Sequence, residues 1–357
     1  MPYVNVRDFG ARGDGVTDDT RAITTAMEAA SGSDGTVYFP KGIYCVHPIS
    51  VPSGITLMGN ASWGYSAFGY GNNKIEEGDP VDPDYNGQTV LFSLSQDAEA
   101  LLTLEDCCGN RVIGLSLDGE YKGDHFNGIY VKGGHAIFLE DIRCCHFTGN
   151  GVRISADTYA IRRSLLIKNT GASVDGSAGS HGRIIDCQLA YNDGPGFFAD
   201  GTEDVSFTGS RIEGGCAGVK IAGGSQIAIT GNSFDSPRGP AIHLDSCSVC
   251  ALTGNMARIS GARREVSDDN THCRLENSRG VAMIGNTFWG WFRLAKRHST
   301  HFGMVISHLE DSVITGNAFY ESCSDDLCRD LGGHQNLIME NNTGSVFDLS
   351  TFPPEEE

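Results

Sequence analysis

Polar side chains recur at the same place in a series of short, strand-like segments in the middle of the chain. Apolar and polar residues alternate along Gly128–Lys132 and Ile242–Asp245, for example. Such alternation is typical of a β-strand with one buried face. When the segments are aligned, one outward column contains Tyr130, Arg153, Lys220 and His243, and a second contains Lys132, Ser155, Asp175, Asp200 and Asp245.

Three aspartates of the second column have a spacing that suits cleavage of a glycosidic bond. Strands of one sheet lie about 4.8 Å apart, so Asp175 and Asp200 on successive coils would lie roughly 5 Å apart, and Asp200 and Asp245 roughly 10 Å apart. Hydrolysis uses two carboxyl groups, about 5 Å apart for retention and about 6.5–9.5 Å apart for inversion. We therefore predict that Asp175, Asp200 and Asp245 are catalytic. The alternative is that each aspartate caps a turn at the end of its strand.

The basic and aromatic residues of the first column are predicted to bind substrate. Tyr130, Arg153, Lys220 and His243 could hold the carboxylate or hydroxyl groups of a sugar. The same four residues would also supply a base and positive charge for β-elimination from a uronic acid.

Further binding candidates lie outside the two columns. His181 and Glu213 are on neighbouring loops, and Trp63 and Trp291 belong to two inserts rich in aromatic residues. Exposed aromatic rings stack on sugars. The alternative is that these inserts fill subunit interfaces, which favours a homo-oligomer.

A repeat of about 22 residues must position these side chains. Each copy is a short apolar strand that ends in Thr-Gly-Asn or a close variant, with its last residue at Asn150, Ser210, Asn232, Asn255, Asn286 or Asn317. From Ser210 to Asn232 is 22 residues, and the steps to Asn286 and to Asn317, of 31 residues each, contain the polar inserts Arg263–Cys273 and Trp291–Thr300. The period predicts a parallel β-helix, with asparagines of successive coils stacked in a ladder.

The ends of the chain have a different pattern. Asp18–Ser31 is predicted to be an amphipathic helix that caps the first coil, and Thr36–Pro40 and Ile55–Gly59 are predicted to be the first strands. We expect one β-helix domain over residues 1–350, with the cap and first strands in 1–60, and an acidic tail over 351–357.

Composition limits the partners of the protein. The net charge of −19 argues against nucleic acid, and no apolar run approaches the roughly 18 residues of a membrane span. The 12 cysteines are expected to be small side chains inside the coil. Neither a metal nor a cofactor is expected, because no complete ligand pattern is present. The chain starts without the pattern of a signal peptide.

Three N-terminal segments resemble the signature of the pectate-lyase-like β-helix superfamily, namely Val4–Ala11, Gly13–Thr20 and Gly35–Tyr44. Its members include polygalacturonase-like glycoside hydrolases, polysaccharide lyases, alginate epimerases and phage tailspike depolymerases. The resemblance implies a right-handed parallel β-helix, a carbohydrate substrate and an extracellular location, with the cytoplasm as the alternative. Gly231–Asn255 also resembles the inulin fructotransferases, which implies a homotrimer.

Motifs of the individual families are mostly missing. The coils lack the Asn-Thr-Asp and Asp-Asp pairs of polygalacturonases, and Gly179–Ile184 only faintly matches their Gly-His-Gly and Arg-Ile-Lys motifs. The Asp-Pro-His motif of alginate epimerases is also missing. We therefore predict a glycoside hydrolase acting on a polysaccharide or oligosaccharide. A polysaccharide lyase is the first alternative, and a fructotransferase or a non-enzymatic, tailspike-like glycan-binding protein is the next.

Overall fold

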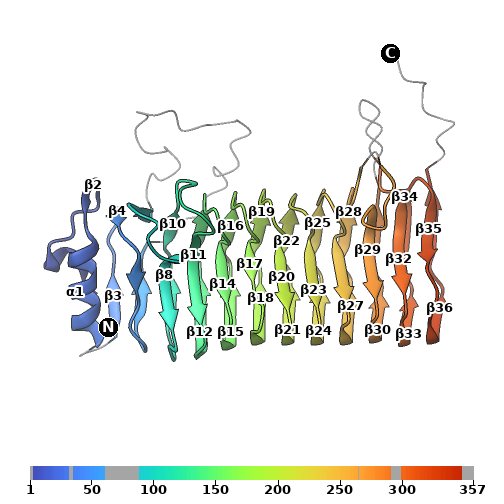
Figure 1. The fold of residues 1–357 in the computed structure, drawn as a ribbon, viewed down its shortest axis with the longest axis horizontal. Coiled ribbons are helices and arrows are strands. Elements are labelled where there is room, and N and C mark those ends of the chain that lie inside the picture. Colours follow the sequence, from blue (N-terminus) through green and yellow to red (C-terminus); the bar gives the residue numbers. More distant parts are fainter. Residues whose placement is uncertain (1–2, 32–34, 61–87, 264, 291–298, 348–357) are drawn as a thin grey trace, which may run out of the picture. The chain divides into compact units, whose positions relative to one another are not determined.

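A computed structural model describes residues 3–31, 35–60, 88–263, 265–290 and 299–347 (Figure 1). The chain divides into two compact units, Met1–Gly171 (unit 1) and Ala172–Glu357 (unit 2). In each unit the chain winds through three parallel sheets, which we call A, B and C, and each coil adds one strand to each sheet. The predicted fold class, an all-β parallel β-helix with an N-terminal capping helix, is confirmed. The expected extent of one domain stays a prediction.

Unit 1 contains the N-terminal cap and the first coils. Sheet A is made of β1 (Val4–Asn5), β3 (Thr36–Tyr38), β6 (Thr56–Met58), β9 (Arg111–Ile113), β12 (His135–Glu140) and β15 (Asp157–Arg162). Sheet B is made of β2 (Asp14–Asp18), β4 (Gly42–Val46), β7 (Thr89–Ser93), β10 (Ser116–Asp118), β13 (Arg143–Cys145) and β16 (Leu165–Ile167). Sheet C is made of β5 (Ile49–Ser50), β8 (Ala100–Glu105), β11 (Asn127–Lys132) and β14 (Val152–Ile154).

The described residues of unit 2 form seven strands in each of its sheets. Sheet A is made of β18 (Ser180–Ile185), β21 (Glu203–Thr208), β24 (Ser225–Thr230), β27 (Ser248–Thr253), β30 (Arg279–Ile284), β33 (Glu310–Thr315) and β36 (Gln335–Glu340). Sheet B is made of β19 (Gln188–Ala190), β22 (Arg211–Glu213), β25 (Ser233–Asp235), β28 (Met256–Arg258), β31 (Thr287–Trp289), β34 (Ala318–Cys323) and β37 (Thr343–Val346). Sheet C is made of β17 (Val174–Asp175), β20 (Phe197–Asp200), β23 (Val219–Ala222), β26 (Ile242–Asp245), β29 (Thr271–Glu276), β32 (Phe302–Ser307) and β35 (Asp326–Asp330).

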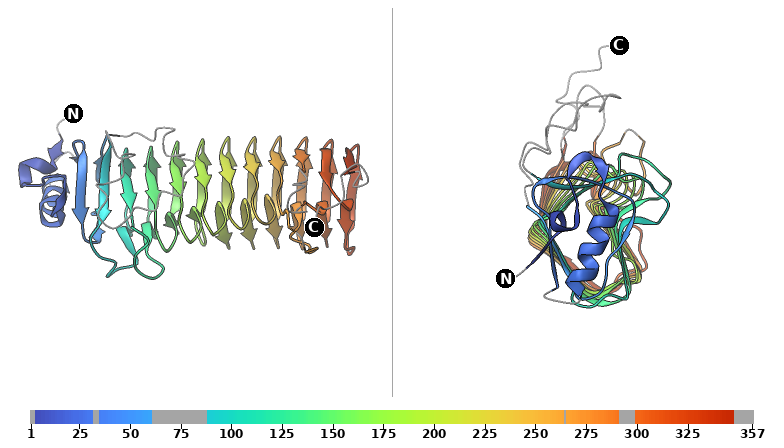
Figure 2. Two further views of the ribbon diagram at one scale, coloured as in Figure 1. Left: turned by 90° about the horizontal axis from the view of Figure 1, so that it is seen from above. Right: turned by 90° about the vertical axis from the view of Figure 1, so that its left-hand side faces the viewer.

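A short helix covers the first coil of unit 1. The 3-10 helix η1 (Val6–Phe9) is followed by β2 and then by α1 (Thr20–Ser31), which lies across the end of the coil (Figure 2). Its apolar face is buried through Ile23, Ala26, Met27 and Ala30. The helix begins two residues later than predicted, because Asp18 accepts a hydrogen bond from the Thr20 backbone N–H at 3.0 Å and so ends the preceding strand.

The predicted asparagine ladder is present in unit 2. Each ladder residue lies between a strand of sheet A and the next strand of sheet B, and its backbone N–H donates to the side-chain oxygen of the next ladder residue. At Asn255 this bond reaches Oδ1 of Asn286 at 2.9 Å, and Asn232 donates to Oδ1 of Asn255 at 3.0 Å. The first Thr-Gly-Asn copy does not belong to this ladder, since Asn150 lies between sheets B and C and pairs with Asn127.

The inside of each coil is apolar. Its largest fully buried side chains include Phe147 in unit 1 and Phe207 and Phe234 in unit 2. Nine of the 12 cysteines are buried and all 12 are free thiols, which agrees with the expected role as small interior side chains. Within the described residues, no helix is long and apolar enough to cross a membrane.

Candidate functional site

A row of charged side chains crosses the outer surface of sheet C in unit 2. Lys220 in β23 is in register with His243 in β26, and His243 is in register with Arg274 in β29. Glu276 follows two residues after Arg274 on the same strand face, because side chains alternate along a strand. We call Lys220, His243, Arg274 and Glu276 the His243 cluster.

Hydrogen bonds fix the imidazole and the carboxylate of this cluster. Nε2 of His243 lies 3.1 Å from Oε2 of Glu276. Arg274 contacts both oxygens of the same carboxylate, with Nη2 2.9 Å from Oε1 and Nε 2.6 Å from Oε2. If Nε2 of His243 carries the proton of this hydrogen bond, the lone pair of the ring is on Nδ1. Glu276 therefore orients His243 as the carboxylate of a catalytic triad orients its histidine.

The surroundings of His243 favour the neutral imidazole. Burial lowers its pKa, and the nearby charges of Arg274 and Lys220 lower it further, against the hydrogen bond to Glu276. The side chain of His243 is 13% exposed, so it is shielded and still reachable. A neutral, oriented imidazole between two cations can accept a proton from an anionic substrate.

Two further carboxylates border the cluster. Asp269 lies on the segment before β29, with Oδ1 2.7 Å from Nη1 of Arg274. Asp245 is in register with Glu276 on the adjacent strand. Hydrogen bonds from Asn277 and Ser246 lower the pKa of Asp245 and outweigh its partial burial. Asp245 therefore stays ionised near neutral pH and is a poor general acid.

The alignment that placed Asp175 beside Asp200 is wrong by two residues. In the structure Asp175 is in register with Phe198, and Asp200 is in register with Ala222. Val174 is in register with Phe197, so β17 begins two residues later than the alignment assumed, and it ends at Asp175, whose Oδ1 accepts from the backbone N–H of Ser177 at 3.1 Å and from its hydroxyl at 2.6 Å. Asp175 thus caps a turn. Asp200 and Asp245 share a column, with Ala222 between them.

The first predicted column is correct within each unit. Lys220 and His243 are neighbours in unit 2, and Tyr130 and Arg153 are neighbours in unit 1. The Tyr130 ring lies between two cations, with Cζ of Arg153 4.7 Å and Nζ of Lys132 4.9 Å from its centre. Lys132 also forms an ion pair with Glu99. This surface offers an aromatic ring and positive charge to a ligand.

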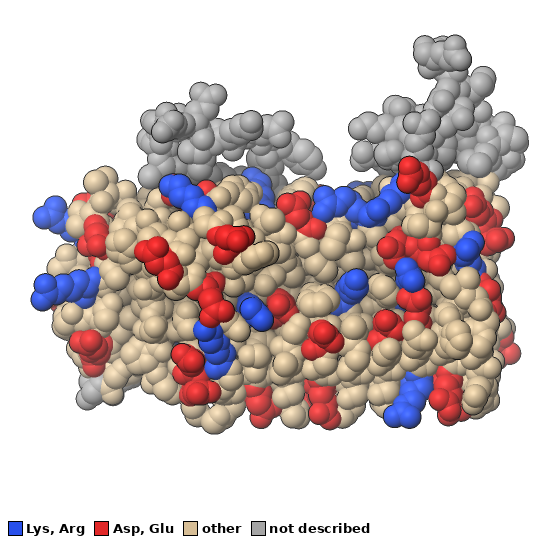
Figure 3. All heavy atoms as spheres, viewed as in Figure 1, with Lys and Arg blue, Asp and Glu red and all other residues tan. Residues whose placement is uncertain are grey.

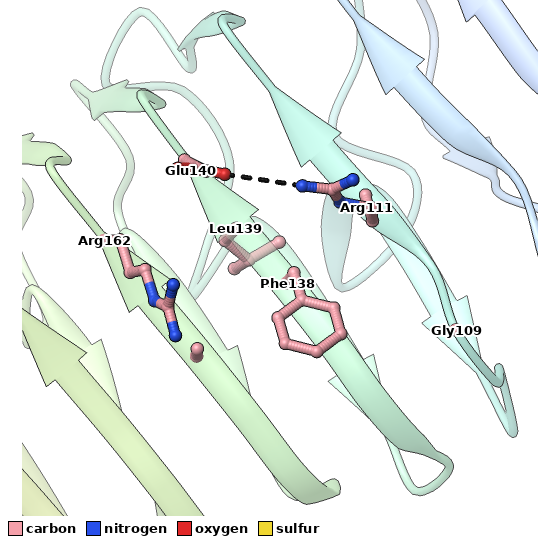
Figure 4. Close-up of a pocket in the computed structure, with 7 residues that line it drawn as sticks. Gly109, Arg111, Phe138, Leu139, Glu140 and Arg162 are labelled. Carbon is pink, nitrogen blue, oxygen red and sulfur yellow. Dashed lines mark ion pairs between the residues drawn. The ribbon is translucent and has the colours of Figure 1, made fainter.

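A shallow pocket in unit 1 has a similar composition. It has a volume of about 250 Å³ and lies on sheet A, where Phe138 in β12 stands between Arg111 in β9 and Arg162 in β15 (Figure 4). Glu140 lies at one end, 3.6 Å from Nη2 of Arg111. A ring flanked by two guanidinium groups suits an anionic sugar, and the sequence alignment did not single out this pocket.

The remaining predicted residues are not part of the His243 cluster. His181 is in β18 of sheet A, and Glu213 is in β22 of sheet B, where it is 3.0 Å from Nη2 of Arg211. Trp63 and Trp291 lie outside the described residues. Acidic and basic side chains are interspersed on the face shown in Figure 3, so the net negative charge is not gathered there in one patch.

Arg274 and Glu276 were missed by the sequence alignment. The segment Cys273-Arg274-Leu275-Glu276 has the same alternation as Ile242-His243-Leu244-Asp245, and that similarity could have revealed it. The repeat spacing predicts an insert over Arg263–Cys273, whereas β29 begins at Thr271 and so starts inside that range.

Comparison with known proteins identifies the family. Residues 3–99 match the family model "Rhamnogalacturonase A/epimerase, pectate lyase-like", and residues 127–288 match "Right handed beta helix region". The chain belongs to the pectate-lyase-like right-handed β-helix superfamily. This confirms the resemblance of the N-terminal segments.

Several members of this superfamily are similar to the chain. Mannuronan C5-epimerase AlgE1 of Azotobacter vinelandii is 30% identical over 69% of this chain and 17% of its own length. A capsule-specific depolymerase of Klebsiella phage K5-2 is 20% identical over 88% of this chain and 36% of its own length. The solved A-module of the A. vinelandii epimerase AlgE6 matches with a TM-score of 0.66 and 17% identity, covering 99% of this chain and 100% of that module. The chain thus spans about a sixth to a third of the curated relatives named here.

Proposed function

We propose that this protein acts on an acidic polysaccharide and that the His243 cluster removes the proton from carbon 5 of a uronate residue. The observation that carries the proposal is the row Lys220–His243–Arg274, in which burial and positive charge keep the imidazole neutral while Glu276 orients it. The names of the epimerase relatives, which act on mannuronan at C5, support the same substrate class.

The proposed step begins with the sugar carboxylate beside the cations. Lys220 neutralises its charge, which acidifies the adjacent C5–H bond. Nδ1 of His243 takes the proton, and Glu276 stabilises the resulting imidazolium. The electron pair left on the sugar has two outcomes. It expels the oxygen at C4 and forms a C4–C5 double bond, which is elimination, or C5 takes up a proton on its opposite face, which is epimerisation.

The geometry gives less support to hydrolysis by paired carboxylates. A general acid needs a raised pKa, whereas the hydrogen bonds of Asp245 lower its pKa. Its neighbour Glu276 is held by Arg274 and His243, and the neighbour of Asp200 is Ala222. Hydrolysis with Asp200 and Asp245 on either side of Ala222 is the second candidate, because that separation of two coils is within reach of an inverting pair.

The test is turnover in D2O on polymannuronate, polygalacturonate and a neutral glucan, followed by NMR and mass spectrometry. Epimerisation places one deuterium at C5, and elimination gives an unsaturated product that absorbs ultraviolet light. Hydrolysis adds one water per cut and leaves C5–H unchanged. Hydrolysis without exchange at C5 would contradict the proposal, and so would failure to turn over any uronate polymer.

Variants identify the base. We expect His243→Gln to lower kcat by about 10²–10⁴-fold, the usual contribution of a general base. His47→Gln is the control, because His47 is half-exposed near Asp18 in unit 1 and should leave kcat unchanged. Because burial and the neighbouring cations lower the pKa of His243, the rate should fall on the acid side only at a pH below the usual titration range of histidine. Wild-type activity of His243→Gln would remove His243 from the mechanism.

The oligomeric state is a separate proposal. The expected homotrimer rests on the sequence resemblance and is tested by light scattering of the full chain during size-exclusion chromatography. A monomeric mass would contradict it.

A further inference from the structure

Three metal-ligating side chains meet at a buried corner of unit 1. Asp118 is the last residue of β10, Cys145 is the last residue of β13, and His146 follows it. Asp118 and Cys145 are directly opposite each other in the register of sheet B. One ligand atom from each of the three residues lies within 4.8 Å of the other two.

The separations of these atoms resemble those of a tetrahedral metal site. Oδ2 of Asp118 is 2.9 Å from Nδ1 of His146 and 3.7 Å from Sγ of Cys145. Zinc bonds of about 2.0–2.1 Å to nitrogen and oxygen and about 2.3 Å to sulfur imply separations of about 3.3 and 3.5 Å at tetrahedral angles. Shifts of a few tenths of an ångström would therefore bring Oδ2 of Asp118 to these separations, and all three ligand atoms lie within 4.8 Å of one another.

Burial makes a positive ion favourable at this corner. The side chains of Asp118 and His146 are 2% and 11% exposed, and Cys145 is fully buried. A bound metal would deprotonate Cys145, and the carboxylate and thiolate would then carry two negative charges that a divalent ion balances in this buried place. The corner thus attracts positive charge.

Neighbouring groups orient the three ligands. The backbone N–H of Glu120 donates to Oδ1 of Asp118 at 2.8 Å, which leaves Oδ2 directed toward His146. The ring of Tyr121 lies 4.8 Å from the ring of His146 and covers it, and the Tyr121 backbone N–H donates to the His146 carbonyl at 2.6 Å. Outer contacts of this kind hold ligands in the orientation that a metal requires.

We propose that Asp118, Cys145 and His146 bind a zinc ion, with water as the fourth ligand. One thiolate, one imidazole and one carboxylate form a donor set that suits Zn²⁺, and the two anions balance its charge. Calcium and magnesium prefer sites made of oxygen atoms alone. The ion would fasten the turn after β10 to the end of β13, so it is independent of the proposed chemistry at His243.

The test uses the full chain, stripped with a chelator and then incubated with Zn²⁺ or Ca²⁺ before dialysis. We expect about one zinc per chain by mass spectrometry of the metal, a higher Tm with Zn²⁺, and no retained Ca²⁺. Co²⁺ in place of Zn²⁺ should give the near-ultraviolet charge-transfer band of a thiolate ligand. Less than about 0.1 zinc per chain would overturn the proposal.

Matched variants distinguish this corner from surface binding. Cys145→Ser, Asp118→Asn and His146→Asn should each lower zinc retention at least tenfold; asparagine tolerates the positive φ of 60° at residue 146. Cys108→Ser is the control, because Sγ of Cys108 lies 3.0 Å from Nε2 of His135 on the exposed surface of the same unit. Zinc that is lost in Cys108→Ser and kept in Cys145→Ser would overturn the proposal.

A variant that misfolds would also fail to retain zinc, so folding has to be checked separately. Circular dichroism of each variant in the presence of chelator is therefore measured first. If Cys145→Ser does not fold, the Co²⁺ spectrum of Cys108→Ser decides, because among the described residues Cys145 groups with a histidine and a carboxylate at metal-binding distance. Absence of the thiolate band in that protein would overturn the proposal.

Discussion

The corner that leads from sheet A to sheet B is built differently in the two units. In unit 1 it contains apolar Leu115 and Ile142, followed by Ser164. In unit 2, after Cys187 and Ser210, it contains the ladder Asn232, Asn255, Asn286, Asn317 and Asn342. The first four of these asparagines are at most 1% exposed.

This difference shows two ways to stabilise the same bend. Ile142 fills the interior, and its backbone N–H is satisfied from the next coil by the Ser164 hydroxyl at 3.3 Å. In the ladder, the side-chain oxygen of Asn255 accepts from the backbone N–H of Asn232 in the preceding coil, and its side-chain amide donates to Oδ1 of Asn286 in the next coil. An interior ladder asparagine therefore needs a polar residue in both neighbouring coils. The Ile142 corner takes one such hydrogen bond from the next coil, whereas each interior ladder asparagine bonds to the coils on both sides and so couples successive coils.

The largest effect is expected from breaking the ladder. Asn255→Ala removes side-chain bonds to Asn286 (2.9 Å) and to the Ile229 carbonyl (2.8 Å), and it leaves the buried Asn232 N–H without its acceptor. We expect a loss of about 3 kcal/mol in the free energy of unfolding, measured with urea. Glu340→Ala is the control, since Glu340 is exposed at the end of β36 and should change stability by less than about 0.5 kcal/mol. Equal effects would contradict the coupled ladder.

The next largest effect is expected when asparagine replaces the apolar residue at a corner of unit 1. Ile142→Asn should cost about 2 kcal/mol, because it removes a fully buried side chain and the preceding corner residue, Leu115, offers no side-chain amide. Ile142→Val should cost about 1 kcal/mol by the loss of one methylene. Urea unfolding of both variants measures the difference. A neutral Ile142→Asn would show that asparagine suits either corner.

A smaller effect is expected at the residue before the ladder. Gly231 has a φ of 65°, and a Cβ there would meet no atom within 4 Å. Gly231→Ala should therefore cost about 1 kcal/mol through backbone strain alone. Thermal unfolding monitored by circular dichroism measures it, and an unchanged Tm would show that the backbone relaxes.

The smallest effect has the opposite sign. Asp186 occupies the position equivalent to Gly231 with a φ of 54°. Asp186→Gly should stabilise the protein by about 0.5 kcal/mol, because relief of the strain exceeds the added flexibility of glycine in the unfolded chain. A lower Tm in this variant would imply that the Asp186 side chain contributes more than its backbone costs.

Much of the architecture was predictable from the sequence. The spacing of Thr-Gly-Asn copies indicated the coils and the ladder, and the alternation around Lys220 and His243 gave the correct outward column. The same reasoning misplaced Asn150, which has the ladder motif at a different corner. A local motif specifies a turn, but it does not specify which of three corners the turn occupies.

The period-two alternation and the 22-residue repeat by themselves determined the fold and the residues that face outward, because both follow from local backbone geometry. Only the tertiary structure decided which outward residues meet. The register of β17 with β20 places Asp175 beside Phe198 instead of Asp200, and the insert before β29 concealed Arg274 and Glu276. Likewise Asp118 and Cys145, 27 residues apart, converge through strand register. Register depends on the length of every turn in between, and no local pattern in the sequence records that length as a distance in space.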